Sequence, residues 1–331
     1  MSTQYSDNVI LLNLSDNTLY DQPALTMSVI HNMQLYGQVE IITVEAPAFN
    51  SNGLYNLLDS ICHKFKFDPK KITITTANPY EQHDQYNIVH CDFVWVKPTV
   101  KQYLLNGFSA EKFEDQKKLN KNVFGSFNNR PTWYRLCLVN HLCKYIEKSI
   151  ISCNTSWDEL SPNCIPFDTL ATHVPPEEYY RIIELIKKCP MELPGGAITR
   201  EQKTYHEFEK TLTSLMPLYN NFFVDIVGVT FTVGDTFYID EKEIRPMLCL
   251  TPFILYGTNG HLESLRGRGF KTFSNWWSEE YDQYSGYRRL QEIYKVIDYL
   301  SSMSVTELQS MYQDMLPTLK HNYNQLMTQY E

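Results

Sequence analysis

Charged residues beside predicted helix starts are the side chains of this sequence best suited to bind a phosphate group. Glu241 and Lys242 open one predicted helix, and Arg130 stands beside Pro131 at the start of another, with Arg135 about one turn further on. The free N–H groups and dipole of a helix N-terminus bind anions, and a guanidinium can hold a phosphate through two hydrogen bonds. A carboxylate such as that of Glu241 can accept hydrogen bonds from both ribose hydroxyls of a nucleotide. These residues therefore predict a site for a phosphate-bearing ligand such as a nucleotide.

The alternative for these charged residues is structural. The helix dipole alone favours an acidic residue in a first turn, and arginines commonly flank an amphipathic helix on the surface. The position of Glu241 and Lys242 ahead of an apolar strand and a glycine-containing turn favours the binding interpretation.

Motifs of several other mechanisms are absent from the sequence. It contains no GxGxxG fingerprint, no GxxxxGK[ST] phosphate loop and no GxSxG nucleophile elbow. It also lacks an Asp-x-Asp pair, the usual anchor of a metal–diphosphate complex. The eight cysteines form no CxxC pair, which favours buried free thiols over a zinc site. We therefore expect a site with no metal and no cofactor.

The order of predicted elements indicates two α/β domains. A chain of 331 residues is long enough for two cores. In the first half, apolar strand-like segments alternate with helix-like segments, which is typical of a parallel sheet covered by helices. Residues 106–120 are charged and lack apolar periodicity, so we expect a linker between a domain at 1–115 and a second at 120–331. The expected strands lie at 8–14, 39–44, 71–75, 88–96, 122–127, 148–153 and 222–230, and the expected helices at 24–35, 54–65, 131–145, 176–188 and 199–219, with a last helix after Ser304 that Pro317 interrupts.

The second half carries a recurrent combination of short motifs. They are Glu-Lys-x-x-x-Pro at 241–246, an apolar strand with Gly-x-x-Gly-x-Leu at 257–262, and Gly-Phe-Lys-Thr-Phe at 269–273. Phe-Gly at 124–125 and Arg-Pro-x-Trp at 130–133 precede them, and Trp-x-Glu-x-Tyr-Asp at 277–282 follows. Together they resemble the donor-binding half of GT-B-type glycosyltransferases, particularly the fucosyltransferase-like branch and related phage or large-virus proteins. One departure is Val229-Thr230, where that group usually has a Glu-Thr pair.

The resemblance implies a fold and a reaction. The fold is two Rossmann-like domains facing across a cleft, with the terminal helix returning toward the hinge. The reaction is the transfer of a sugar from a nucleoside-diphosphate donor to a hydroxyl acceptor. The base would come from the first domain, where the sequence offers Asp16, Glu45 and His31 without choosing among them. The donor-binding residues would be Arg130, Arg135, Thr232, Glu241, Lys242, Tyr256 and Gly257.

Two other functions stay open at this point. One is a catalytically inactive glycosyltransferase-like fold that acts as a structural or binding protein, which Val229 favours. The other is a different nucleotide-sugar enzyme, such as an epimerase. The acceptor is equally open among saccharide, lipid, protein and modified nucleic acid.

Charge and hydropathy bound the partners and the location. A formal net charge of -9 argues against broad attachment to duplex nucleic acid, which needs clustered basic residues. No segment approaches the roughly 20 apolar residues of a membrane helix, and the first residues lack the pattern of a signal peptide. We expect no membrane span and a cytoplasmic protein, in the host cytoplasm if the chain is viral.

Overall fold

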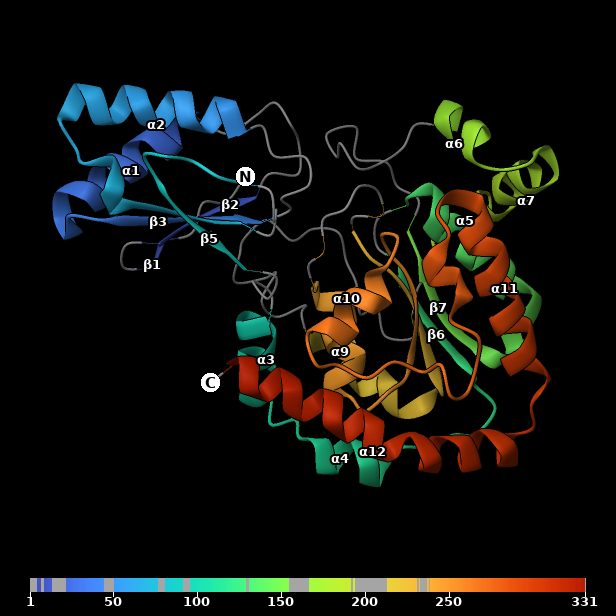
Figure 1. Cartoon of the computed structure of the whole chain (residues 1–331). Helices are drawn as coiled ribbons and strands as arrows, with labels where there is room; N and C mark the ends of the chain where they lie inside the picture. The colour runs from blue at the N-terminus through green and yellow to red at the C-terminus, as the bar shows by residue number, and fades with distance from the viewer. Residues whose placement is uncertain are drawn as a thin grey trace. The chain divides into compact units, whose positions relative to one another are not determined.

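The protein forms two compact units, each built on a parallel sheet, in a computed structural model (Figure 1). The first unit comprises Met1–Val94 with Thr236–Tyr238, and the second comprises Trp95–Asp235 with Ile239–Glu331. The structure describes residues 5–6, 9–13, 22–44, 51–76, 81–91, 96–128, 131–154, 167–191, 193, 213–230, 232, 237 and 239–330. No described helix has the length and apolar content needed to cross a lipid bilayer.

The sheet of the first unit follows chain order. Its strands are β1 (Tyr5–Ser6), β2 (Val9–Asn13), β3 (Val39–Val44), β4 (Ile72–Thr76) and β5 (Asn87–His90), and only the β1–β2 pair is antiparallel. Helix α1 (Gln22–Tyr36) connects β2 to β3, and α2 (Ser51–Phe65) connects β3 to β4, ahead of the short 3-10 helix η2 (Pro69–Lys71). Right-handed crossovers in a sheet that grows in one direction place both helices on the same face. Figure 1 shows α1 and α2 side by side there.

Apolar residues of alternate strand positions form the core beneath these helices. Ile10, Ile41 and Ile74 are adjacent across three strands, and all are fully buried with Val29 of α1 and Leu58 of α2. The strands expected at 8–14, 39–44 and 71–75 and the helices expected at 24–35 and 54–65 are confirmed. The strand expected over 88–96 ends at His90, and a helix begins at Val96.

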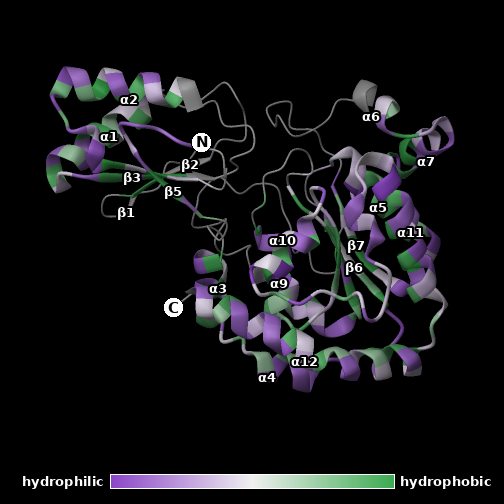
Figure 2. Ribbon diagram, viewed as in Figure 1, coloured by the Kyte–Doolittle hydropathy of each residue, from purple (hydrophilic) through white to green (hydrophobic). Residues whose placement is uncertain are grey.

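The sheet of the second unit has the spatial order β7-β6-β8-β9, and all its strands are parallel. The strands are β6 (Phe124–Asn128), β7 (Ser149–Cys153), β8 (Val224–Gly228) and β9 (Phe253–Tyr256). Every residue of β8 and β9 is buried, which is typical of a parallel sheet covered on both faces. In Figure 2 the strands β6 and β7 are mostly green, whereas α11 and α12 alternate between purple and green.

Helices cover both faces of this sheet because the connections leave it in opposite directions. The chain moves from β6 through α5 to β7 on one side, and from β8 through α9 to β9 on the other. Right-handed crossovers then place α5 and α9 on opposite faces, where α11 packs against α5, and α3 and α12 pack against α9. The helices of the second unit are α3 (Val96–Leu105), α4 (Ala110–Gln116), α5 (Trp133–Leu142), α6 (Phe167–His173), α7 (Pro176–Ile186), α9 (Glu241–Leu248), α10 (His261–Gly267), α11 (Gly286–Ser302) and α12 (Val305–Tyr330), with the 3-10 helices η3 (Cys143–Lys148), η4 (Met216–Asn221) and η5 (Glu280–Gln283).

The terminal helix begins as expected but continues further than its sequence suggests. The Ser304 hydroxyl accepts from the Glu307 N–H, and the Glu307 carboxylate accepts from the Ser304 N–H, which is a capping box. The interruption expected at Pro317 is wrong, because α12 runs through it to Tyr330. Pro317 and Gln313 are both exposed, so the carbonyl that the proline leaves without a donor is on the solvent side.

The linker expected at residues 106–120 is instead part of the second unit. Ser109 caps α4 by accepting from the Lys112 N–H, and Phe113 and Leu119 are buried. Helix α3 packs against α9 and α12, and α4 packs against η4. The two units consequently divide at Val94, about twenty residues before the expected boundary at 115 to 120. The many charged residues of this segment obscured its few apolar residues, of which Phe113 and Leu119 pack in the core.

The other expected elements of the second unit are largely confirmed. The strands at 122–127, 148–153 and 222–230 correspond to β6, β7 and β8, and the helix at 176–188 corresponds to α7. The helix expected at 131–145 ends at Leu142 and continues as η3. Of the helix expected at 199–219, residues 199–212 lie outside the described residues.

Candidate functional site

The carboxyl edge of the second sheet has a topological switch point between β6 and β8. From these two neighbouring strands the chain continues to opposite sides of the sheet. Their register pairs only Phe124 with Val224 and Gly125 with Asp225, so the pairing stops before the carboxyl halves of both strands. In open α/β sheets ligands bind at such a point, because the diverging connections leave a crevice at the strand ends. We therefore build the candidate site from this edge.

Asp240 fixes the first turn of α9 at the end of β8. Its carboxylate accepts from the backbone N–H of Lys242 at 2.8 Å and from the N–H of Thr230 at 3.1 Å. Glu243 accepts in turn from the Asp240 N–H at 3.3 Å, which completes a capping box. Burial opposes ionisation of Asp240, but the charge and hydrogen bonds of Lys242 and the charge of Arg135 lower its pKa overall. The local sequence Asp-Glu-Lys-Glu thus defines where α9 starts.

Glu241 and Lys242 lie side by side at this helix start, as the sequence predicted. The Lys242 Nζ is 2.6 Å from a Glu241 carboxylate oxygen and 3.2 Å from an Asp240 oxygen, and it donates to the Thr230 hydroxyl at 3.1 Å. The side chains of Glu241 and Lys242 are 18% and 19% exposed. Both are therefore held at the strand end and still accessible to a ligand.

Arg135 is buried at the carboxyl end of β8. It is 3% exposed, and its Nε and Nη2 donate to the Gly228 carbonyl at 3.0 and 2.9 Å. Nη2 also donates to the Val229 carbonyl at 3.2 Å, which accepts from the Tyr134 hydroxyl as well. A Cβ on Gly228 would lie 2.9 Å from the Arg135 Cγ, so the glycine makes room for this side chain. The guanidinium expected to grip phosphate binds backbone carbonyls here and contributes its charge to the edge.

The N-terminus of α5 has no side-chain cap. Thr132 is the N-cap residue, but its side chain makes no capping hydrogen bond. It is 5% exposed, and its Oγ1 has no hydrogen-bond partner within the described part of the chain. The first N–H groups of a helix need partners from outside the helix, and a negatively charged group is favoured there. Thr132 adds an unpaired hydroxyl to those N–H groups.

The N-terminus of α10 is closed by the protein itself. The Asp282 carboxylate accepts from the backbone N–H groups of Leu262 at 3.0 Å and Glu263 at 3.2 Å. Arg289 pairs with the other Asp282 oxygen at 2.8 Å and donates to the Thr258 carbonyl at 2.6 Å. A carboxylate thus occupies the anion position of α10, so this helix start is part of the framework.

A buried histidine links α9 to α10. The His261 Nε2 is 2.7 Å from a Glu243 oxygen, and the two side chains are 2% and 0% exposed. Burial raises the pKa of Glu243, although His261 opposes the shift. A Cβ on Gly257 would lie 2.8 Å from the His261 Nδ1, so Gly257 serves to admit the imidazole. Sequence reasoning missed this pair, because no local pattern connects residues 18 positions apart.

Tyr256, the last residue of β9, packs against the aromatic rings of Tyr134 and Trp133. It is 2% exposed, and its ring stacks on Tyr134 with centroids 4.7 Å apart and planes 11° apart. Its hydroxyl donates to the Gly286 carbonyl at 3.2 Å. Tyr256 therefore has a packing role at this edge and is not itself accessible to a ligand.

The remaining predicted residues are spread over the chain. Thr232 is described and half-buried beyond the end of β8. His31 is exposed on α1 of the first unit. Asp16, Glu45 and Arg130 lie outside the described residues.

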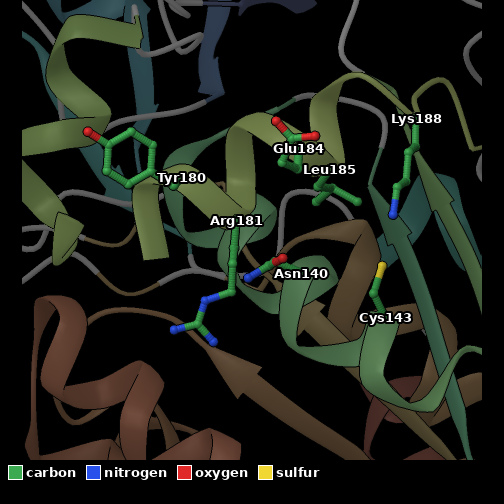
Figure 3. A pocket seen from close by; sticks show the side chains of 7 residues that line it. All are labelled: Asn140, Cys143, Tyr180, Arg181, Glu184, Leu185 and Lys188. Carbon is green, nitrogen blue, oxygen red and sulfur yellow. The ribbon is translucent and has the colours of Figure 1, made fainter. Parts of the chain in front are cut away.

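Two pockets lined by described residues lie away from this edge. A pocket of about 330 Å³ lies between the C-terminal part of α5 and α7, far along α5 from Thr132. In Figure 3 the amine of Lys188 points toward Cys143, whereas the Arg181 side chain points away from Cys143. This pocket shares no residue with the carboxyl edge and is lined by Asn140, Cys143, Tyr180, Arg181, Glu184, Leu185 and Lys188. A second pocket of about 380 Å³ in the first unit is lined by Asp59 and residues 82–85.

Among the described residues, no group of three or more His, Cys, Asp or Glu side chains is placed to hold a metal ion. Comparisons of the chain with protein-family models, curated proteins and solved structures found no match.

Proposed function

We propose that the chain is a glycosyltransferase that binds a nucleoside-diphosphate sugar at the carboxyl edge of its second sheet and transfers the sugar to a hydroxyl acceptor. The observation that carries this proposal is the convergence of two cationic side chains on one strand end. Arg135 of α5 and Lys242 of α9 reach this end from opposite faces of the sheet, and both contact residues 228–230. The N-terminus of α5, which has no side-chain cap, follows β6 at the same edge.

The diphosphate would lie between the two helices. The first N–H groups of α5 and the Thr132 hydroxyl would donate to its oxygens, and Lys242 would turn from Glu241 to the phosphate. Glu241, released from Lys242, would accept hydrogen bonds from the ribose. Donors fixed in this way stabilise the negative charge that develops on the leaving diphosphate. Arg135 would stay bound to the Gly228 and Val229 carbonyls, and its positive charge would attract the diphosphate without a direct contact.

The proposal extends to the first unit. Deprotonation of the acceptor hydroxyl needs a carboxylate or an imidazole, and Asp16, Glu45 and His31 are its candidates. The GT-B arrangement, with two domains facing across a cleft and α12 returning toward the hinge, belongs to the same proposal. The resemblance in sequence supports it, as does the presence of two parallel sheets.

Replacing Lys242 with alanine is expected to weaken nucleoside-diphosphate binding about tenfold or more. A hydrogen bond to a charged group contributes about 1.5 to 3 kcal/mol, and this one would be lost from the complex. Isothermal titration calorimetry with ADP, GDP, CDP and UDP measures the change. The matched control is Lys295→Ala, which removes an exposed lysine that also pairs with a glutamate, Glu292. Equal affinities of the two variants for the preferred nucleotide would contradict the assignment of Lys242.

Turnover is expected to continue in the presence of a chelator. The site would neutralise the leaving diphosphate with Lys242, Arg135 and the α5 N-terminus, so no divalent ion is required for that step. Release of nucleoside diphosphate from a panel of nucleotide sugars, with EDTA and with added Mg²⁺ or Mn²⁺, provides the measurement. Activity that EDTA abolishes and a divalent ion restores would show that this electrostatic account is wrong. Asp240 and Glu243 would then have to be re-examined as metal ligands.

A second function is favoured by one observation. Val229 stands where the resemblance leads us to expect a glutamate, so this position supplies no carboxylate. The valine side chain is buried, at 3% exposed. A glycosyltransferase-like protein that binds a nucleotide sugar without transferring it would fit that change. Tight binding without diphosphate release in the same panel would favour this alternative, or an epimerase.

A further inference from the structure

Trp133 and His173 form a stacked aromatic pair at the start of α5. Their ring centroids are 4.7 Å apart, and the ring planes differ by 9°. Trp133 is the first residue of α5 and 7% exposed, whereas His173 is the last residue of α6 and exposed. One face of the imidazole thus lies on the indole, while solvent reaches the histidine.

Two tyrosine rings pack against the indole at nearly right angles. The Tyr134 and Tyr256 rings each meet Trp133 almost at right angles, with centroids 5.8 Å away. These tyrosines also stack on each other. Aromatic pairs in such edge-to-face and stacked geometries are mutually favourable, so the indole is a rigid support for whatever lies on it.

A second histidine stack in the same unit shows what purely internal packing looks like. His141 stacks on Tyr294 with centroids 3.9 Å apart and planes 6° apart. It is 6% exposed, and its Nε2 is 2.6 Å from an Asp298 oxygen. His173 differs in both respects, because it is exposed and its ring nitrogens have no hydrogen-bond partner within the described ranges. Its stack therefore offers an aromatic surface to solvent.

We propose that the His173–Trp133 stack is the platform for the base of a nucleoside diphosphate. This inference rests on the proposed function, since Thr132, at the expected phosphate position, directly precedes Trp133. One ligand can then place its phosphates on the N-terminus of α5 and its base on the exposed imidazole. All nucleobases have an aromatic face, so stacking binds them with little dependence on their identity. The platform strengthens binding of the nucleoside part and leaves the phosphate part unaffected.

Substitution of His173 separates these two contributions. Calorimetric titrations use ADP, GDP, CDP, UDP and inorganic pyrophosphate with the wild-type chain, His173→Ala and His173→Phe. We expect His173→Ala to weaken nucleoside-diphosphate binding about fivefold or more and to leave pyrophosphate affinity within about twofold of wild type. His173→Phe keeps an aromatic face and should retain nucleotide affinity. His63→Ala removes an exposed histidine from α2 of the first unit and serves as the control.

The other possible results contradict either the stacking platform alone or the proposed function together with it. Equal weakening of nucleotide and pyrophosphate binding by His173→Ala would mean that His173 only supports the start of α5. Unchanged nucleotide affinity in His173→Ala would mean that the base lies elsewhere, and the proposed function would stand. If the wild-type chain binds neither pyrophosphate nor any nucleotide, the proposed function fails, and the platform fails with it.

Discussion

Replacing Arg289 with leucine is expected to lower the free energy of unfolding by about 3 to 5 kcal/mol, the usual effect of breaking a buried ion pair. The Arg289 and Asp282 side chains are 1% and 6% exposed, and they are joined at 2.8 Å. Without the guanidinium, the carboxylate stays buried at the N-terminus of α10 with its charge uncompensated. The Thr258 carbonyl also loses one of its two donors and keeps the His261 N–H at 3.2 Å. Urea unfolding followed by circular dichroism measures the change.

The neighbouring arginine provides the control. Arg288 pairs with Glu292 one turn along α11, but its side chain is 57% exposed. Exposed pairs contribute little, so Arg288→Leu should change stability by about 0.5 kcal/mol or less. The two substitutions remove the same charge from adjacent positions of one helix. Similar unfolding midpoints for both variants would contradict the role given to the Arg289–Asp282 pair.

Replacing Gly125 with alanine is expected to lower the free energy of unfolding by about 3 kcal/mol, at the upper end of the range for overpacked cores. A Cβ on Gly125 would lie 2.6 Å from the Phe222 Cε2. Phe222 is fully buried, and its ring packs against Tyr219 and Phe127 with centroids 5.0 and 5.8 Å away. The ring is fully buried among these side chains, so either the ring or strand β6 must shift to make room. Thermal and urea unfolding of the variant measure the loss.

Two further variants test the cause of this loss. Gly267→Ala adds a Cβ to α10 where no heavy atom lies within 4 Å, so it should leave stability unchanged or raise it slightly. Phe222→Leu in the Gly125→Ala background should cost less than in the wild-type chain, because it also relieves the overlap. Additive effects of the two substitutions would rule out direct contact as the reason.

Local signals in the sequence were enough to predict most strands and helices. Residues 39–44 and 71–75 are rich in β-branched residues, and both became strands. Ser304 and Glu307 predicted the start of α12 because a capping box involves only neighbouring residues. The same locality placed Glu241 and Lys242 correctly at the first turn of α9. The alternation of elements in the first half also indicated a parallel sheet there, whereas a second Rossmann-like domain was implied by the resemblance to glycosyltransferases, which stays a prediction.

Segments whose packing partners are distant in the sequence were not predictable in this way. The segment at 106–120 looked like a linker because six of its fifteen residues are charged and its apolar residues follow no helical or strand period. Its fold depends on Phe113, which packs within an aromatic group that includes Tyr103, itself in contact with Tyr323 of α12. No local pattern shows that α12 returns to cover this segment.

The sequence by itself determined where some helices of the second unit start, among them α9 and α12, and which charged residues stand at those starts. Only the tertiary structure decided what each of these residues does. Arg135 binds carbonyls 93 and 94 positions away, Asp282 closes a helix start 20 positions before it, and His173 lies on Trp133. The physical reason is that a cap or a periodic pattern is a property of neighbouring residues. The partner of a buried charge or an aromatic face is instead set by the way in which the sheet brings separate strand ends together.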